Sequence, residues 1–292
     1  MNIISFDIEE WFLEKEYYGG RSARYQEYDR LLASILDELD KNKIKATFFC
    51  LGKIATDFPH IIKKIASKGH EIGCHSNMHQ WLNKLSKEEV LADTKDAIMA
   101  LEDVCGQRVV SYRAPAFSIG ETNKWAFEIL AECGILRDAS VFPAERDFGG
   151  FSSFVEDSPT IIETSSGIIK EFPICTTSLM NLKFAFSGGG YFRFFPYNYI
   201  NHLIKQRSYT MCYFHIADLI NEKVGFMTRS EYETYFKENG SLINRCKRFV
   251  KSSIGTKSAH TKLNRLINEH GFISLDCADR LIDWSTKPHI IL

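Results

Sequence analysis

The stretch Gly69–His79, with the sequence GHEIGCHSNMH, gives the strongest signal in the chain. It reads as a short strand that continues as a loop or as a first helical turn. His75 and His79 are four residues apart, a spacing that on a helical turn puts both imidazoles on one face. Neutral imidazole is a common zinc ligand, and a catalytic zinc typically has three protein ligands. A carboxylate from elsewhere therefore has to complete the site, and without one the two histidines are ordinary loop residues.

The first strand ends in three carboxylates. Residues 2–8 read as a buried strand, so Asp7, Glu9 and Glu10 crowd the end of an apolar run. Such crowding is unfavourable without a cation or a proton, although a solvated loop is the plain alternative. Residues two apart in a strand share a face, which puts Asp7 and Glu9 in one site. If the strand already ends at Ile8, Glu10 takes the ligand role instead.

Length and composition describe an ordinary globular protein. The 292 residues are 45% hydrophobic and 25% charged, with a net charge of -1, which gives no indication of nucleic-acid binding. The apolar stretches are too short to span a bilayer, and the N-terminus resembles a strand rather than a signal peptide. The eight cysteines are scattered singly, which is typical of buried thiols in a reducing compartment. We therefore expect a cytoplasmic protein.

Predicted strands and helices alternate along most of the chain, which favours a parallel α/β architecture. We treat residues 1–292 as one domain whose last part, about 228–271, is mostly helical. In such folds the chemistry gathers at the carboxyl ends of the strands. The candidate residues that fall there are Asp7, Glu9, His75, His79, Arg113, Asp138 and His215. Taken singly, the last three could be a surface ion-pair residue, a turn cap and a core histidine.

At this point the chain resembles the polysaccharide deacetylase family, carbohydrate esterase family four. The matching segments keep the family's order: FDIEEW at 6–11, ATFF at 46–49, GHEIGCHSNMH at 69–79, RAP at 113–115, DASVFP at 138–143 and YFH at 213–215. The segment GGGYFR at 188–193 is similar to the branch tied to bacterial surface polysaccharide assembly.

The resemblance implies an irregular, often seven-stranded (β/α) barrel that removes an N-acetyl group from an amino sugar. It implies Asp7 as general base, His215 as general acid, Arg113 as the partner of the base and Asp138 as a supporting residue. His75 and His79 would hold zinc or another divalent metal such as cobalt, nickel, iron or manganese.

Two departures from the family pattern bear on these roles. The family usually has adjacent aspartates after the phenylalanine, but here Ile8 intervenes, so the third ligand becomes Glu9 or Glu10. The usual proline after the last histidine is Ile216. The first departure leaves the third ligand open, and the second affects the pose of His215.

Substrate contacts are expected from a glycine-rich segment and two further residues. Tyr191, Phe192 and Arg193 suit stacking on a sugar and gripping a phosphate, although an apolar loop packed on the barrel fits equally well. Pro115 and Trp11 complete the expected sugar-binding set. The expected substrate is an N-acylated amino sugar, free or lipid-linked, used in surface polysaccharide synthesis (O-antigen, capsule or exopolysaccharide).

Two other functions fit the same residues. One is a deformylase or cyclic-amide hydrolase, and the other is an inactive sugar-binding protein. A basic segment is expected either as a solvated helix face or near an anionic partner such as a membrane surface. Its members are Arg245, Lys247, Arg248, Lys251, Lys257 and Lys262.

Overall fold

The computed structural model describes residues 1–144, 149–154, 158–179, 182–220, 225–236 and 238–292. Its centre is a nine-stranded sheet in the order β10-β1-β2-β3-β4-β5-β7-β6-β11. The first seven strands in this order are mutually parallel. They are β10 (Thr210–His215), β1 (Asn2–Ile8), β2 (Thr47–Cys50), β3 (Glu71–Cys74), β4 (Ser111–Tyr112), β5 (Arg137–Asp138) and β7 (Gly167–Glu171).

The expected α/β fold, with its mostly parallel central sheet of the (β/α) barrel type, is confirmed. The expected count of seven strands describes only the parallel part of the sheet. β6 (Thr160–Thr164) forms an antiparallel hairpin with β7, and β11 (His289–Ile291) adds beyond it. These two strands extend one edge.

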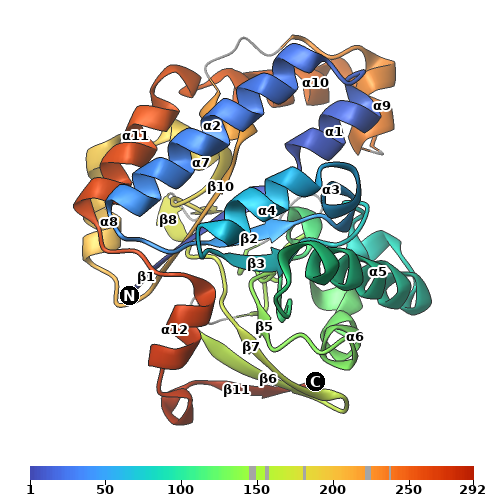
Figure 1. Cartoon of the computed structure of the whole chain (residues 1–292), viewed down its shortest axis with the longest axis vertical. Coiled ribbons are helices and arrows are strands. Elements are labelled where there is room, and N and C mark those ends of the chain that lie inside the picture. Colours follow the sequence, from blue (N-terminus) through green and yellow to red (C-terminus); the bar gives the residue numbers. More distant parts are fainter. Residues whose placement is uncertain (145–148, 155–157, 180–181, 221–224, 237) are drawn as a thin grey trace.

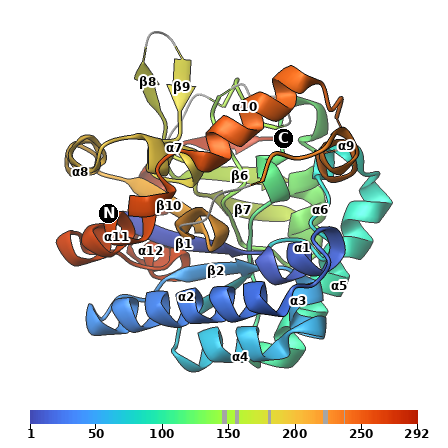
Figure 2. The ribbon, with the colours of Figure 1, turned by 90° about the horizontal axis from the view of Figure 1, so that it is seen from above.

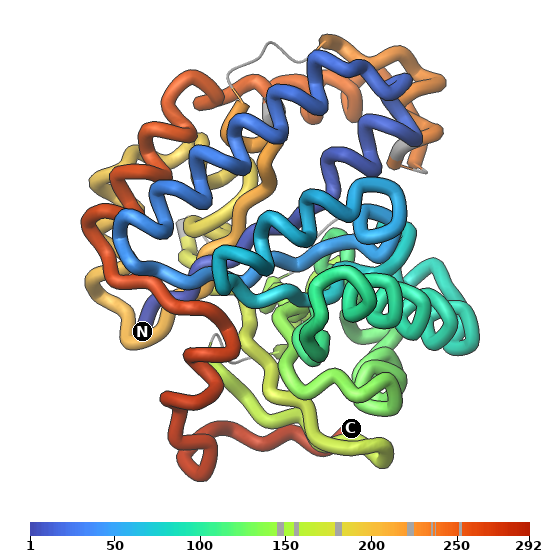
Figure 3. The backbone as a smooth tube through the Cα atoms, in the orientation of Figure 1, coloured from blue at the N-terminus to red at the C-terminus, as the bar shows by residue number. Residues whose placement is uncertain are grey.

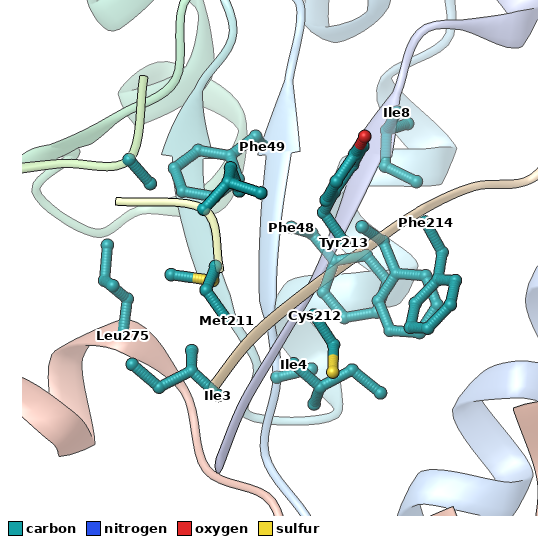
Figure 4. Packing of buried hydrophobic residues seen from close by; sticks show 14 of the residues in the cluster. Ile3, Ile4, Ile8, Phe48, Phe49, Met211, Cys212, Tyr213, Phe214 and Leu275 are labelled. Carbon is teal, nitrogen blue, oxygen red and sulfur yellow. The ribbon is translucent and has the colours of Figure 1, made fainter. Parts of the chain in front are cut away.

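Strand β1 is covered on both faces, since every residue after Asn2 is buried. Its neighbour β10 comes from the other half of the chain, and the two run side by side through the middle of the molecule in Figure 3. Figure 4 shows side chains of both strands packing with Phe48 of β2, and Phe6 stacks on that ring at 5.0 Å. Burying both faces of parallel strands explains their nearly continuous apolar sequence.

Helices cover the sheet between successive strands (Figure 1). The first half of the chain contributes α1 (Glu10–Tyr17), α2 (Ser22–Lys41), α3 (Gly52–Asp57), α4 (Pro59–Ser67), α5 (Lys87–Cys105) and α6 (Ala126–Glu132). Helix α5 starts at the capping box of Ser86 and Glu89, in which each residue's side chain accepts a hydrogen bond from the other's backbone N–H.

The second half is more irregular. Strands β8 (Thr177–Leu179) and β9 (Leu182–Phe184) form a separate hairpin that projects from the body in Figure 2. Five helices follow: α7 (Gly189–Phe194), α8 (Tyr197–Lys205), α9 (Arg229–Phe236), α10 (Leu242–Ser253) and α11 (Thr256–Glu269). A last helix, α12 (Leu275–Leu281), precedes β11. The described residues between 228 and 271 are thus mostly helical, as the sequence predicted.

Within the described ranges, no helix is both long enough and apolar enough to cross a membrane.

Candidate active site

The carboxyl ends of four parallel strands open into one pocket of about 360 Å³. The sheet register sets the geometry, since Asp7 on β1 is the direct neighbour of His215 on β10. His75 and Arg113 follow β3 and β4 by one residue, and the backbone N–H of each continues the ladder to the preceding strand. Asp7, Glu9, His75, His79 and His215 all line the pocket. The structure therefore brings the expected strand-end residues together.

Glu9, His75 and His79 form a cluster that could hold a metal ion. Their ligand atoms all lie within 4.8 Å of one another. Glu9 Oε2 lies 2.6 Å from His79 Nε2 and 3.5 Å from His75 Nε2. The predicted carboxylate partner for the two histidines is therefore in place.

The two histidines are brought together by a loop, not by a helical turn. The backbone is left-handed at Ser76 (φ 69°) and at His79 (φ 55°). Asp93 on α5 accepts hydrogen bonds from the backbone N–H groups of Asn77 and Met78, at 2.8 and 3.3 Å. These bonds and that of the His79 N–H to Ser76 Oγ hold the loop.

The protonation states of the cluster suit the binding of a cation. His75 Nδ1 lies 2.7 Å from the carbonyl oxygen of Arg113, which can only accept, so Nδ1 carries the proton and Nε2 keeps its lone pair for a ligand. Glu9 Oε2 is buried and faces only the two histidine Nε2 atoms among the described polar groups within ion-pair distance. Burial opposes the ionised form of Glu9, but the neighbouring His79 and His215 lower its pKa well below the ordinary value. Two imidazoles and an ionised carboxylate fit a divalent metal such as zinc.

Glu10 has a different environment and lies outside this cluster. β1 ends at Ile8 and α1 begins at Glu10, so the strand alternation used to choose Glu9 does not extend that far. Both Glu10 oxygens accept hydrogen bonds, from the backbone N–H of Ala217 at 2.7 Å and of Glu9 at 3.3 Å. Burial and then the charge of Glu9 raise the pKa of Glu10 to about 8. The geometry favours Glu9 as the ligand.

Asp7 is held by a buried guanidinium. Arg113 Nη1 donates to Asp7 Oδ1 at 2.8 Å and to Ser5 Oγ at 2.9 Å, and the arginine is fully buried. The guanidinium also lies over the ring of Phe49 at 4.3 Å. A buried charge of this kind needs a counter-charge, so Arg113 fixes the Asp7 carboxylate at the edge of the pocket.

Asp138 supports Arg113 from behind and does not reach the pocket. It is fully buried and accepts hydrogen bonds from the N–H and the hydroxyl of Ser140. Ser140 Oγ in turn accepts from the N–H of Ala114, and Arg113 Nε donates to the carbonyl of Ala139. This placement agrees with the supporting role that the sequence suggested.

His215 lies beside Asp7 and Glu9 in the pocket. Its Nε2 is 3.7 Å from Asp7 Oδ2 and 3.9 Å from Glu9 Oε1, and its Nδ1 is 2.9 Å from Asp218 Oδ2. Burial alone would lower the pKa of His215, but the charges of Glu9, Asp218 and Asp7 outweigh it and raise this pKa well above its usual value. A protonated imidazole beside a carboxylate base is suited to donate a proton.

Arg193 pairs with the carboxylate that orients His215. Its Nη2 lies 3.4 Å from Asp218 Oδ1, and it lines the pocket together with Tyr191. Gly188, just before α7, packs directly against Tyr213, where a side chain would collide with the ring. The glycine run therefore allows α7 to pack on β10.

The structure corrects three of the expected substrate contacts. Trp11, Pro115 and Phe192 are buried and do not line the pocket. Trp11 Nε1 donates to Asp29, and Phe192 packs edge-on against Phe214 with ring centroids 4.8 Å apart. Pro115 starts a short 3₁₀ turn after Arg113. All three are core residues.

Another part of the pocket wall consists of residues that were not among the predicted site residues. Tyr17 and Tyr18 at the end of α1 line the pocket, as do Trp81, Phe236 of α9 and Arg248 of α10. The Arg248 guanidinium lies 4.0 Å from the centroid of Phe236. An aromatic wall with one cation is a surface on which a sugar ring can stack. Only the basic character of the segment around Arg248 could have hinted at this.

Comparisons with known proteins find similar sequences and structures. A family model described as polysaccharide deacetylase matches residues 26–136, and one described as a domain of unknown function matches residues 139–279. A peptidoglycan-N-acetylglucosamine deacetylase from Bacillus cereus is 39% identical over 95 residues. This match covers 32% of this chain and 34% of that relative, so the chain spans about a third of its length.

Solved structures share the fold over the whole chain. A protein from Mycobacterium smegmatis assigned as a polysaccharide deacetylase has a TM-score of 0.64 at 18% identity, covering 100% of this chain and 92% of the other. A family-four pseudoenzyme from Bacillus anthracis has a TM-score of 0.51 at 13% identity, covering 100% and 69%. Residues 26–136 therefore match the polysaccharide deacetylase family, carbohydrate esterase family four, and the whole chain shares the fold of these solved structures.

Proposed function

We propose that this protein is a metal-dependent hydrolase that removes the N-acetyl group from an amino sugar. The observation that carries the proposal is that Asp7, held by Arg113, and His215, held by Asp218, line the same pocket as the cluster Glu9, His75 and His79. The relatives named as deacetylases of peptidoglycan support the same chemistry. Both a proton acceptor and a proton donor thus face one pocket.

Each residue has a distinct task in this reaction. Asp7 accepts a proton from the attacking water, while Arg113 keeps the carboxylate in position. Water oxygen bonds to the carbonyl carbon, the carbon–nitrogen bond breaks, and His215 donates a proton to the departing nitrogen. Asp218 holds His215 in the orientation that directs Nε2 into the pocket. The products are acetate and the free amine.

Glu9, His75 and His79 would hold the metal, for which we propose zinc, with cobalt, nickel, iron or manganese as alternatives to test. When bound, a divalent cation supplies a Lewis acid that polarises the amide carbonyl. The ligand set of two imidazoles and one carboxylate supports this choice.

The context we propose is bacterial surface polysaccharide synthesis on the cytoplasmic side of the membrane. The substrate is then an N-acetylated sugar chain, free or lipid-linked. Arg248 and the aromatic side chains beside it would contact a second sugar unit or an anionic group. The eight unpaired cysteines support a reducing compartment.

A sugar-binding protein without activity is the main rival, because a pseudoenzyme shares this fold. The presence of Asp7, His215 and the three candidate ligands in one pocket supports the enzyme over the binding protein. A deformylase or cyclic-amide hydrolase would use the same residues on another amide.

One experiment separates the three functions. The purified protein is loaded with each candidate metal and given N-acetylated and N-formylated amino sugars, nucleotide-linked sugars and oligosaccharides. We expect acetate release that depends on metal and is lost in Asp7→Asn. Formate release alone would favour the deformylase, and sugar binding without turnover at any metal would favour the binding protein.

A further inference from the structure

Helix α10 has its apolar face turned outward. None of its described side chains is buried, and the exposed apolar ones recur on one face as Leu242, Ile243, Cys246, Phe249 and Val250. Ile243 is 68% exposed and Val250 is 53% exposed. A surface helix of a globular protein normally turns this face toward the core. In Figures 1 and 2, α10 lies at the periphery of the molecule.

The polar face of α10 is the one that contacts the protein. Arg245 Nε donates to the carbonyl of Gly240 and its Nη1 to that of Met227. The Asn244 amide donates to the carbonyl of Asn239, and Arg248 points into the pocket over Phe236. These contacts fix the rotation of α10 about its own axis, so its apolar face points outward.

The apolar surface continues beyond the helix. Ile254, directly after α10, is exposed, and so is Phe226, whose ring packs edge-on against Phe249 at 5.7 Å. Gly255 packs against the backbone of Arg193, which places the exposed Phe194 near the same end of α10. A contiguous exposed apolar surface on one side is typical of an interaction site.

The charged residues of the segment that contains α10 have one sign. Between Glu238 and Glu269 the sequence contains no acidic residue, while its basic residues are Arg245, Lys247, Arg248, Lys251, Lys257, Lys262 and Arg265. Not all of these are free for a partner, because Lys262 donates to the carbonyls of Phe192, Arg193 and Phe195. Lys247 and Lys257 are exposed beside the apolar residues. Of the predicted basic segment, Lys247 and Lys257 therefore face solvent, whereas Lys262 is bonded to backbone carbonyls of the body.

We propose that α10 docks on an anionic lipid surface, with Leu242, Ile243, Phe249 and Val250 in the apolar boundary and Lys247 among the headgroups. An amphipathic helix with an apolar face and flanking lysines binds in the plane of such an interface. A second copy of the chain fits less well, because pairing two such helices would bring cations together without an acidic partner.

Docking in this orientation would bring the pocket to the membrane. Arg248 lines the pocket from the inner face of the same helix whose outer face would contact lipid. The inference deepens the proposed function, because a sugar carried by an anionic lipid would then be presented to the pocket from the surface. It identifies the substrate class as a glycan attached to, or lying at, an anionic membrane.

Vesicle flotation of the full chain tests the proposal. We expect binding to vesicles of phosphatidylcholine with phosphatidylglycerol, little binding to phosphatidylcholine alone, and release at high salt. The double variant Ile243→Ser, Val250→Ser should reduce the bound fraction about tenfold or more, because two exposed apolar side chains no longer enter the interface. Neither residue lines the pocket.

The matched control is Met99→Ser, Leu281→Ser, which changes two equally exposed apolar residues on α5 and α12, at 62% and 65% exposure. It should bind vesicles like the unchanged protein. Equal binding by both double variants, or no binding to anionic vesicles, would overturn the proposal. So would dimerisation in sedimentation that only Ile243→Ser, Val250→Ser abolishes, without vesicle binding.

Acetate release from a water-soluble oligosaccharide, measured on the same preparations, separates this inference from the proposed function. Activity without vesicle binding refutes the membrane proposal alone. Vesicle binding without activity refutes the deacetylase proposal alone.

Discussion

The two halves of the chain build the pocket in different ways. Residues up to about 138 supply Asp7, Glu9, His75, His79 and Arg113 from strand ends and tight loops. The later residues supply His215 and Asp218, and α9 and α10 complete a helical wall to which α1 of the first half also contributes. The first group is almost wholly buried and fixed by backbone contacts, whereas Tyr17, Tyr18 and Arg248 of the wall are more open to solvent. The comparison suggests that the strand-end group determines whether the reaction occurs and the helical wall determines what is bound.

The largest expected effect comes from removing a metal ligand. His75→Ala and Glu9→Ala should each lose metal and activity together, because the buried cluster cannot replace a missing ligand atom. Metal content of the purified variants, by elemental analysis, checks this. Glu10→Ala is the control, since its oxygens contact backbone N–H groups and not the histidines. If Glu10→Ala lost metal and Glu9→Ala kept it, the assignment of Glu9 would be wrong.

Asp7→Asn should keep the metal but reduce kcat by ~10²–10⁴-fold, the usual contribution of a general base. The amide preserves the shape of the side chain but cannot accept a proton from water. The comparison of kcat with metal content in one preparation distinguishes this variant from a ligand variant. Loss of metal from Asp7→Asn would make Asp7 a ligand and not a base.

Asp218→Asn tests the contribution of the second half to chemistry. The charge of Asp218 helps to raise the pKa of His215, so the acid form persists to higher pH in the unchanged protein. Without that charge the pKa falls, and the alkaline limb of kcat should move to lower pH. At neutral pH we expect a loss of about 10–10²-fold, less than for removal of an acid. An alkaline limb that stays in place would exclude His215 as the proton donor.

The site and the fold were predictable from sequence to different extents. The strand-end residues could be found because a buried strand followed by a carboxylate or a histidine is unusual and local. The route by which His75 and His79 meet could not be found, because the left-handed backbone at Ser76 and the anchor at Asp93 depend on tertiary contacts.

Trp11 and Phe192 were wrongly predicted to contact the substrate, although they are core residues. An aromatic residue beside a motif suits stacking on a sugar and packing in a core equally well, and only the surrounding fold decides. Strand β11 was missed because it is a short strand at the edge of the sheet. It pairs with β6, which is far away in the sequence.

Arg248→Gln tests whether the wall acts on binding alone. We expect KM for a soluble oligosaccharide to rise about 3–10-fold with kcat nearly unchanged, because the contact is made equally before and during the reaction. Lys247→Gln is the neighbouring control on the same helix and does not line the pocket. A fall in kcat without a change in KM would place Arg248 in the chemistry and weaken the division between the two regions.

The smallest effect on activity is expected at Glu171, a buried residue of β7 beside Asp138. Burial, and then the charge of Asp138, raise the pKa of Glu171 well above its ordinary value, so its carboxyl keeps a proton that it can share with Asp138.

Glu171→Gln replaces one neutral donor by another, so kcat at neutral pH should change by no more than about twofold. Glu171→Leu removes one donor from the buried Asp138 carboxylate and leaves only those of Ser140, so it should cost about 1–3 kcal/mol in the free energy of unfolding. The pH dependence has a definite sign. As pH rises above the ordinary glutamate pKa, the unfolded chain releases this proton while the folded chain retains it, so stability falls until the raised pKa is passed. Melting temperatures from pH 5 to 9 should therefore fall less steeply in Glu171→Gln than in the unchanged protein.

Glu163→Gln, on the neighbouring strand β6 and 45% exposed, is the control and should follow the unchanged protein. If Glu171→Gln were as unstable as Glu171→Leu at neutral pH, the Glu171 carboxyl would be ionised in the unchanged protein, which contradicts this prediction.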